Sequence, residues 1–333
     1  MKNIQLYDPT LRDGNHALSH SISLNDIKNY CKIIDNCELY CVEVGHGNGL
    51  GASSLQLGLA SHSDEDMLST AREMLKNTRL GAHAIPGFAK LDDLRMAIDQ
   101  GVDILRIACH CTEANTTSRY IELVKNSGKL AQGVLMMTHL TSPQNLLEQA
   151  KLQVSYGSDA IIIMDSAGAY TENDVYERIS LLKENINIPI GFHGHNNLGL
   201  AIANSITAAN AGASIIDGTI KGIGAGAGNT ALEVLCAVMM KLGLLNEHKA
   251  LNTISISEKL VATFNSYRSD IKPVNIISGL YGVFSGFEKP VLKFSKEYGV
   301  SPYDIFKILG DRKVVAGQED IIIEIAAELA KQS

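Results

Sequence analysis

Residues 4–16 read IQLYDPTLRDGNH, and this stretch contains the pattern that decides the fold. The short apolar run Ile4–Tyr7 predicts a buried β-strand. Directly after it, a guanidinium (Arg12), a carboxylate (Asp13) and an imidazole (His16) stand within five residues. The apolar segment that follows has the spacing of an amphipathic helix. The stretch therefore predicts a strand that ends in chemically active side chains and leads into a helix.

The same order of elements recurs eight times before about residue 245. Eight consecutive strand–helix units in this length are typical of a (β/α)8 TIM barrel, an α/β fold. A doubly wound open sheet is the alternative, and the count of eight favours the barrel. The predicted strands are Ile4–Tyr7, Leu39–Val44, Leu80–Ile85, Ile104–Ala108, Val134–Thr138, Ala160–Met164, Pro189–His193 and Ser214–Thr219. The predicted helices are Leu24–Asp35, Asp64–Lys76, Leu91–Gln100, Thr117–Asn126, Pro143–Tyr156, Glu172–Asn185, Leu198–Ala211 and Thr230–Leu242.

The last part of the chain no longer alternates and predicts a C-terminal helical extension. We therefore expect a TIM-barrel catalytic domain at residues 1–250 and a helical domain at residues 251–333. The final helix has an apolar face that must pack on the barrel or on another chain, so the extension is expected to act as a lid or a partner-docking domain. Its predicted helices are Ile256–Tyr267, Phe287–Glu297, Pro302–Leu309 and Gln318–Lys331.

Composition excludes several classes of protein. The net charge of −7 and the lack of a basic run argue against nucleic-acid binding. No apolar run reaches the length of about 18 residues that a membrane span needs. Met1-Lys2-Asn3 leads straight into the first strand, which leaves no room for a secretory segment. The six cysteines lack zinc-binding spacing and are expected to be reduced and buried in a cytoplasmic protein.

Polar side chains gather at the predicted ends of the strands. In a TIM barrel the active site lies at the C-terminal ends of the strands. A single histidine is more often structural than catalytic, but most of the ten histidines fall at these ends. Their convergence predicts an active site. In strand order the groups are Arg12/Asp13/His16, Glu43/His46, His83, Arg106/His110, His139, Asp165/Ser166, His193/His195 and Asp217/Lys221.

His193 and His195 are the strongest candidates for metal ligands. A histidine pair of this spacing is a weak signal alone, but in an extended segment both imidazoles point to the same side. With Asp13 they would form a site of two histidines and one carboxylate with open positions for substrate. Nitrogen and oxygen ligands without a nearby thiolate favour Mn²⁺ or Mg²⁺ over a structural Zn²⁺.

Four other features of the sequence have less specific interpretations. Arg12 is read either as one half of a buried ion pair or as a planar donor facing developing charge. His16 has an imidazole suited to acid–base work at neutral pH. The run Cys109–Glu113 predicts a loop rather than a metal site. The glycine-rich segment Gly222–Asn229 lacks the register of a dinucleotide loop and predicts a turn close to the pocket.

The segment Arg12-Asp13-Gly14, the barrel and His193-Gly194-His195 resemble the metal-dependent lyase and Claisen-condensing barrel superfamily. His16 stands where the condensing synthases usually have an amide residue, and it resembles the 4-hydroxy-2-oxovalerate aldolase family. The resemblance covers nearly the whole chain. Its other segments are Gly45–Leu50, His110–Ala114, Met136–His139, Gly224–Asn229 and Gly317–Asp320.

The resemblance implies a class II, metal-dependent pyruvate aldolase. It would cleave 4-hydroxy-2-oxopentanoate, or a related 4-hydroxy-2-oxo acid, between C3 and C4 to pyruvate and an aldehyde. Arg12 would stabilise the pyruvate enolate, His16 would take the proton of the C4 hydroxyl, and Asn229 would support the metal site. The implied metal ligands, for Mn²⁺ as the usual ion, are Asp13, His193 and His195. The implied substrate-binding residues are Arg12, Asp13, Ser166, His193 and Phe284.

The resemblance also implies partners. Members of the family pair through their C-terminal helices with an acylating acetaldehyde dehydrogenase that receives the volatile aldehyde. We therefore expect an acylating aldehyde dehydrogenase partner, a homo-oligomer and a place in aromatic hydrocarbon catabolism.

Two departures from the family pattern concern the substrate. The family usually has Gly-Val-Tyr where this chain has Gly282-Val283-Phe284, although Tyr281 is adjacent. The missing hydroxyl is expected to disturb stereocontrol or substrate choice more than the metal chemistry. The third predicted strand ends in His83–Gly87 where the family is largely leucine, which would admit a different aldehyde.

Three alternatives remain at this point. A Claisen-type enzyme would join an acyl-CoA to a 2-oxo acid and release CoA, but His16 argues against it. A catalytically weak subunit kept for binding a partner would explain the missing tyrosine. A structural barrel with scattered histidines would make their convergence accidental.

Overall fold

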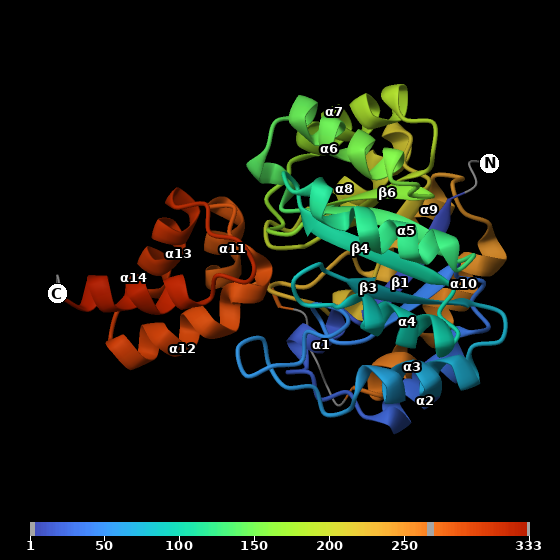
Figure 1. Ribbon diagram of the computed structural model, residues 1–333, viewed down its shortest axis with the longest axis horizontal. Helices are drawn as coiled ribbons and strands as arrows, with labels where there is room; N and C mark the ends of the chain where they lie inside the picture. Colours follow the sequence, from blue (N-terminus) through green and yellow to red (C-terminus); the bar gives the residue numbers. More distant parts are fainter. Residues whose placement is uncertain (1–3, 265–269, 332–333) are drawn as a thin grey trace.

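The computed structural model describes residues 4–264 and 270–331 (Figure 1). Eight parallel strands form a closed barrel in sequence order, and β1 pairs with both β2 and β8. This confirms the TIM barrel, and the open-sheet alternative is wrong. The strands are β1 (Gln5–Leu11), β2 (Cys41–Val44), β3 (Arg79–Ala84), β4 (Ile104–His110), β5 (Leu130–Met136), β6 (Ala160–Asp165), β7 (Ile190–Gly194) and β8 (Ile215–Asp217).

Helices follow the strands and cover the outside of the barrel. Many of them are preceded by a Ser or Thr that caps the helix, with an acidic or amide residue three positions later. For α2 the cap is Ser23, and its partner is Asp26. The helices are α1 (Gly14–Ala17), α2 (Leu24–Ile34), α3 (Asp64–Met74), α4 (Leu91–Asp99), α5 (Ser118–Asn126), α6 (Pro143–Ser155), α7 (Glu172–Asn185), α8 (Ala201–Ala211) and α9 (Leu232–Lys241).

All eight strands lie where they were predicted, and two of them differ most from the predicted bounds. The first was predicted to end at Tyr7, but β1 continues through Asp8-Pro9, a pair that is unfavourable in a strand, to Leu11. Its pairing with β2 shifts register between Asp8 and Leu11, which accommodates a residue without an N–H. The fifth strand was predicted at Val134–Thr138, and β5 instead begins at Leu130. Pairing with β4 there overrides the weak strand preference of alanine and glycine.

Helix α10 (Glu247–Ala262) closes the ring of helices and packs against α9 and α2. It begins nine residues before the helix predicted at Ile256–Tyr267, whose last residues lie outside the described part of the chain. The predicted domain boundary between residues 250 and 251 falls within α10. The division of the chain into two domains remains a prediction.

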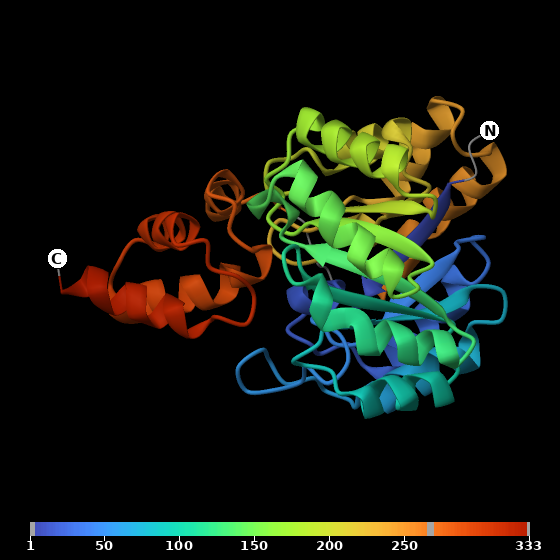
Figure 2. The same cartoon turned by 45° about the horizontal axis from the view of Figure 1, so that its top comes forward.

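A smaller group of helices, here called the C-terminal lobe, lies beside the barrel in both views (Figures 1 and 2). It has its own apolar core, which includes Phe287, Phe306 and Ile325. The first of its helices was missed because it is short and contains β-branched residues and a glycine, although its proline at the first turn is a start signal. The lobe consists of α11 (Pro273–Leu280), α12 (Glu288–Tyr298), α13 (Pro302–Asp311) and α14 (Asp320–Ala330).

Apolar packing is extensive, and polar groups are concentrated at one end of the barrel. The main apolar cluster lies between strands and helices, while Tyr7, Cys41 and Ile162 belong to a separate cluster of strand residues. All six cysteines are free and buried, as predicted. In the described ranges, no helix combines the length and the hydropathy that crossing a bilayer requires.

Candidate metal centre and active site

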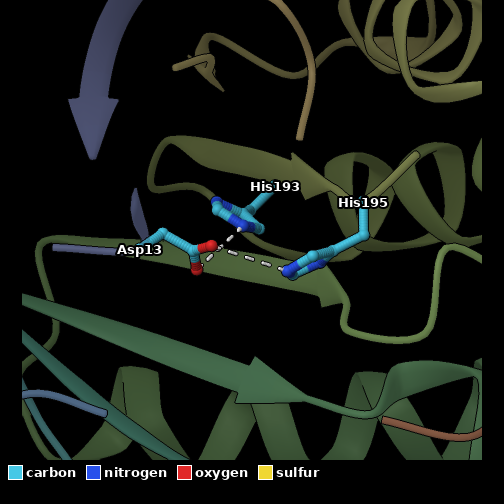
Figure 3. A group of neighbouring side chains, drawn as sticks. All are labelled: Asp13, His193 and His195. Carbon is cyan, nitrogen blue, oxygen red and sulfur yellow. Dashed lines mark ion pairs between the residues drawn. The ribbon is translucent and has the colours of Figure 1, made fainter. Parts of the chain in front are cut away.

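Asp13, His193 and His195 come together at the C-terminal end of the barrel (Figure 3). Asp13 follows β1, His193 lies in β7 and His195 lies just beyond it. The Nε2 atoms of the two histidines each stand 3.9 Å from an oxygen of the Asp13 carboxylate. The three side chains are almost fully buried. Their potential ligand atoms all lie within 4.8 Å of one another, and no other such group of three occurs in the described residues.

Hydrogen bonds fix the protonation of both imidazoles. His195 Nδ1 lies 2.9 Å from the backbone oxygen of Asp165, which can only accept, so this nitrogen carries the proton. His193 Nδ1 lies 2.9 Å from Oδ2 of Asp217 and donates in the same way. Burial lowers the pKa of His195 to about 4, so its ring is neutral at neutral pH. Each Nε2 therefore faces Asp13 while Nδ1 is held by a hydrogen bond, the arrangement that metal-binding imidazoles adopt.

The Asp13 carboxylate is held by the segment that follows β8. Its Oδ1 accepts hydrogen bonds of 3.0 Å from Ala225 N and from Asn229 Nδ2. A Cβ atom at Gly224 would lie 2.7 Å from the same oxygen, so only glycine allows this close approach. Burial alone would raise the pKa of Asp13, but the charge of the neighbouring Arg12 guanidinium holds it well below its usual range.

These residues fit a divalent cation. His193 Nε2, His195 Nε2 and Asn229 Oδ1 are buried and have no hydrogen-bond partner among the described residues. Buried polar atoms are normally paired, so acceptors that converge without a donor indicate that a cation completes the site. Nitrogen and oxygen donors suit Mn²⁺, Mg²⁺ or a similar ion.

Arg12 lies between the metal-ligand candidates and β2. Its Nη1 bonds Asp13 Oδ2 at 2.6 Å, and its Nε bonds Glu43 Oε2 at 2.8 Å. Burial would lower the pKa of this guanidinium, but Glu43 and Asp13 raise it, so it stays charged. Its remaining nitrogen, Nη2, is buried without a partner. Arg12 is therefore an ion-pair partner, as the first sequence interpretation expects, and its unpaired Nη2 amino group can still donate. Its action on developing charge stays a prediction.

Arg106 ties this arrangement to His193. Its guanidinium donates to both oxygens of Asp217, at 2.6 and 2.9 Å, and forms an ion pair with Oε1 of Glu43 at 2.8 Å. Burial would raise the pKa of Asp217, but Arg106 and the hydrogen bond from His193 hold it below its usual range. A buried chain of alternating charges thus runs from Arg12 through Glu43, Arg106 and Asp217 to His193. Such chains fix geometry more than they add stability.

His16 stands at the rim of this centre on α1. Its ring packs against Gly47, where a Cβ atom would lie only 2.6 Å from Nε2. The ring also meets His20 edge-on at 5.5 Å and Phe284 at 6.5 Å between centroids. Burial lowers the pKa of His16 to about 4, and the charge of Asp13 opposes that shift. The imidazole is therefore neutral and able to accept a proton.

A cavity of about 380 Å³ opens beside His16 between the barrel and the lobe. Its walls include Gly224 and Ala225 from the segment that holds Asp13, and Phe284 and Lys289 from the lobe. The cavity gives a small molecule access to His16 and to the loop next to the metal-ligand candidates. The C-terminal end of the barrel therefore has both a group of possible metal ligands and a cavity that opens beside it.

Ser166 lies deeper, at the end of β6. Its hydroxyl accepts a hydrogen bond from Met137 N at 3.0 Å, and its carbonyl accepts one from Ser285 N at 3.0 Å. Asn197 forms a second link to the lobe. Its Nδ2 donates to Asn275 O at 3.2 Å, and its Oδ1 accepts from Ser285 Oγ at 3.0 Å. The lobe is thus hydrogen-bonded to the segments that follow β6 and β7.

Several residues of the site were given no role by sequence reasoning. Glu43, Arg106 and Asp217 were noted only as polar groups at strand ends, and their pairing joins residues up to 111 positions apart. Gly47 lay within a quoted motif, but nothing in the sequence indicates that it supports His16. His83 is buried, its Nδ1 has no partner among the described residues, and burial lowers its pKa to about 3.

Family models match both parts of the chain. An HMGL-like model matches residues 3–261. A model described as a DmpG-like communication domain matches residues 269–331. The first spans the barrel and α10, and the second spans the C-terminal lobe.

Solved structures agree with the fold. The carboxyl transferase domain of Rhizobium etli pyruvate carboxylase matches with a TM-score of 0.84 at 16% sequence identity. The match covers 100% of this chain, which spans only 61% of the length of that chain. At this identity the likeness concerns the fold alone.

Curated relatives agree over the full length. The 4-hydroxy-2-oxovalerate aldolase of Pectobacterium atrosepticum is 53% identical, and the match covers 100% of this chain and 97% of the relative. The enzyme of the same name from Spirochaeta aurantia is 51% identical, with coverage of 98% and 96%. The chain therefore belongs to the 4-hydroxy-2-oxovalerate aldolase family.

Proposed function

We propose that the protein is a carbon–carbon lyase, a metal-dependent pyruvate aldolase that cleaves 4-hydroxy-2-oxopentanoate or a close 4-hydroxy-2-oxo acid. The observation that carries the proposal is that a possible metal site, a hydrogen-bond donor and a possible general base lie together at the C-terminal end of the barrel. Two buried imidazoles and a carboxylate converge with free acceptor atoms, Arg12 has an unpaired buried N–H group, and a neutral His16 faces the entrance. Family membership over the whole chain supports the same reaction.

Asp13, His193 and His195 are proposed to hold the metal, with Asn229 supporting the site. Mn²⁺ is the proposed ion and Mg²⁺ the next, because the ligand set contains only nitrogen and oxygen. When bound, such a cation acts as a Lewis acid on the oxygens of a 2-oxo acid. The charge chain through Asp217 keeps the His193 lone pair directed into the site.

Arg12 and His16 are proposed to carry the reaction. His16 takes the proton of the C4 hydroxyl, the C3–C4 bond breaks, and the aldehyde leaves. The electron pair of that bond stays on the three-carbon fragment as an enolate, and the free N–H group of Arg12 stabilises its oxygen. Protonation at C3 then gives pyruvate. Ser166 and Phe284 are proposed to line the substrate-binding site.

The alternatives are not favoured. The curated relatives that match the whole chain are aldolases, which argues against a Claisen-type condensing enzyme. The complete set of buried functional groups argues against a catalytically weak subunit. A cytoplasmic location stays a prediction from the sequence.

The lobe is proposed to bind an acylating aldehyde dehydrogenase. Support comes from the DmpG-like communication domain and from large apolar side chains that the lobe exposes. Ile276 and Leu280 on α11 are 46% and 64% exposed, and Tyr303 on α13 is 46% exposed. Co-expression with such a dehydrogenase should give a complex on size-exclusion chromatography. If Leu280→Asp elutes with the dehydrogenase as well as the unchanged chain does, this surface is not the contact.

The first experiment measures pyruvate released from racemic 4-hydroxy-2-oxopentanoate with Mn²⁺ and then with EDTA. We expect rapid release that EDTA stops and added Mn²⁺ restores. Both enantiomers should be consumed, because Phe284 lacks the hydroxyl group of the usual tyrosine, and Phe284→Tyr should favour one of them.

The same assay separates the alternatives. Release only from longer or more polar 4-hydroxy-2-oxo acids would keep the mechanism and assign another aldehyde, in line with the polar strand end at His83. No release from any of these acids would refute the aldolase. CoA release from an acyl-CoA and a 2-oxo acid would then identify the condensing enzyme.

A further inference from the structure

Lys289, in the first turn of α12, reaches from the lobe to the helix that carries His16. Its Nζ donates to His16 O at 2.6 Å, to Ala17 O at 3.2 Å and to Ser19 Oγ at 2.8 Å. The two carbonyls end α1, where a helix has acceptors without intrahelical partners. A lysine that satisfies such carbonyls fixes the helix end.

The position of this lysine is unfavourable for its own helix. The N-terminus of a helix carries partial positive charge, so a cation in the first turn opposes it. Glu288, the first residue of α12, has the favourable sign and pairs with Lys272 at 2.8 Å. The dipole of α12 therefore does not favour a lysine at this place, whereas three hydrogen bonds join the side chain to α1 and the residues just after it.

The segment that Lys289 holds is strained. Ser19 and His20 have φ values of 55° and 57°, a left-handed conformation that is uncommon for residues other than glycine. Two such residues in succession persist only when their surroundings hold them. Lys289 binds Ser19 directly, and His20 stacks on His46 with ring centroids 3.7 Å apart.

His16 has little freedom to move. Gly47 supports its ring closely enough that even a methyl group would overlap it. Gly47 is itself fixed, because its oxygen accepts from Arg12 Nη1 at 3.4 Å. A shift of α1 towards Gly47 is blocked, so the ring can move only away from it. A misplacement of about 1 Å can cost on the order of 10²-fold in rate.

We propose that Lys289 is a positioning residue for His16. By holding the last carbonyls of α1 and the strained turn behind it, Lys289 sets the distance between the imidazole and the hydroxyl group of the substrate. The lobe supplies no metal ligand, yet through this side chain it takes part in catalysis. The inference depends on the proposed function of His16 as the base.

The experiment compares Lys289→Met and Lys289→Arg with Lys296→Met. Lys296 lies exposed on the same helix, and no hydrogen bond or ion pair joins it to another described residue. We expect Lys289→Met to lower kcat for retro-aldol cleavage about tenfold with KM unchanged, within the range of small misplacements. Lys289→Arg, which can donate to the same carbonyls, should recover part of the loss. Lys296→Met should match the unchanged protein.

Decarboxylation of oxaloacetate separates positioning from general damage. In that reaction the bond between C3 and the leaving carboxylate breaks, carbon dioxide departs, and the electron pair forms the same enolate, which then takes a proton at C3. No hydroxyl proton has to be removed. Lys289→Met should therefore leave this rate within twofold of the unchanged protein. An equal loss in both reactions would show a merely structural lysine and overturn the inference.

The outcomes distinguish this inference from the proposed function. If the unchanged protein does not cleave any 4-hydroxy-2-oxo acid, the proposed function fails. If it cleaves them and Lys289→Met is as fast, the function stands and the positioning role is refuted.

Discussion

The C-terminal end of the barrel, here called the barrel mouth, and the C-terminal lobe contain different kinds of side chain. All ten histidines precede residue 249, and the lobe has none. The barrel mouth buries charged groups in pairs, whereas the lobe buries apolar side chains and exposes others of the same kind. The comparison teaches that the barrel supplies the reacting groups, and that the lobe acts through contacts with the segments that bear them.

Those contacts are few and specific. Asn197 and Ser285 join the lobe to the segments after β7 and β6. His139 Nε2 lies 2.7 Å from the backbone oxygen of Gly282, and Lys289 holds α1. The links through Asn197, Ser285 and Lys289 reach the segments that bear His195, Ser166 and His16. Changes on the barrel side should therefore have larger effects than changes on the lobe side.

The largest effect is expected for His195→Ala. Loss of one of three ligands removes the cation and with it the stabilisation of the enolate, so kcat/KM should fall on the order of 10³-fold or more. Calorimetric titration with Mn²⁺ should show no tight site. His248→Ala is the matched control, because His248 is exposed and lies away from the site. Full turnover by metal-stripped His195→Ala would refute the site.

His16→Ala should have a smaller effect of a different kind. Removing a general base costs about 10²-fold or more, but the metal ligands stay intact. We expect an unchanged Mn²⁺ affinity together with a reduced rate of cleavage at saturating metal. Weaker metal binding in this variant would indicate that His16 is itself a metal ligand. It would contradict the proposed separation between the metal ligands and the general base.

The smallest effect concerns acid stability. Burial lowers the pKa of His83 to about 3 and of His195 to about 4, below the ordinary value of about 6.5 for an unfolded chain. At pH values between the folded-state pKa and the unfolded-state pKa of each histidine, the unfolded chain binds more protons than the folded one. The free energy of unfolding therefore falls as the pH falls. In the metal-free protein, each residue should lower the free energy of unfolding by on the order of 2 kcal/mol between pH 7 and pH 5.

Urea unfolding at several pH values measures this loss. His83→Leu should make the dependence on pH shallower, because one buried imidazole is gone. Amide protection factors in α13 and α14, which are corrected for the intrinsic effect of pH on exchange, should change less over the same range, since no histidine lies there. A free energy of unfolding that stays constant from pH 7 to pH 5 would contradict the prediction.

The sequence was most informative where a local pattern repeats. Eight apolar runs with helical segments between them predicted the closed barrel, because each unit is decided within about 30 residues. The spacing of His193 and His195 predicted that their side chains share one side, and barrel topology brings Asp13 to the same end. These inferences needed only the periods of the regular elements.

Other features depend on contacts that no local pattern encodes. Lys289 and His16 are 273 residues apart, and a lysine in the first turn of a helix looks unremarkable in sequence. Arg106 and Asp217 carry opposite charges at two strand ends, but their bidentate pairing depends on barrel closure. Helix α11 was missed because its composition resembles a strand, and packing within the lobe decides its form.

Asn197 has a consequence for anyone who shortens this chain. The residue is fully buried, and its amide group finds partners in Asn275, Ser278 and Ser285 of the lobe. A chain cut before α11 would leave that amide facing water or an empty space two positions after His195. A barrel made without the lobe therefore needs a substitution at Asn197 as well as the truncation, because the cut removes the hydrogen-bond partners of a residue that lies next to the proposed metal site.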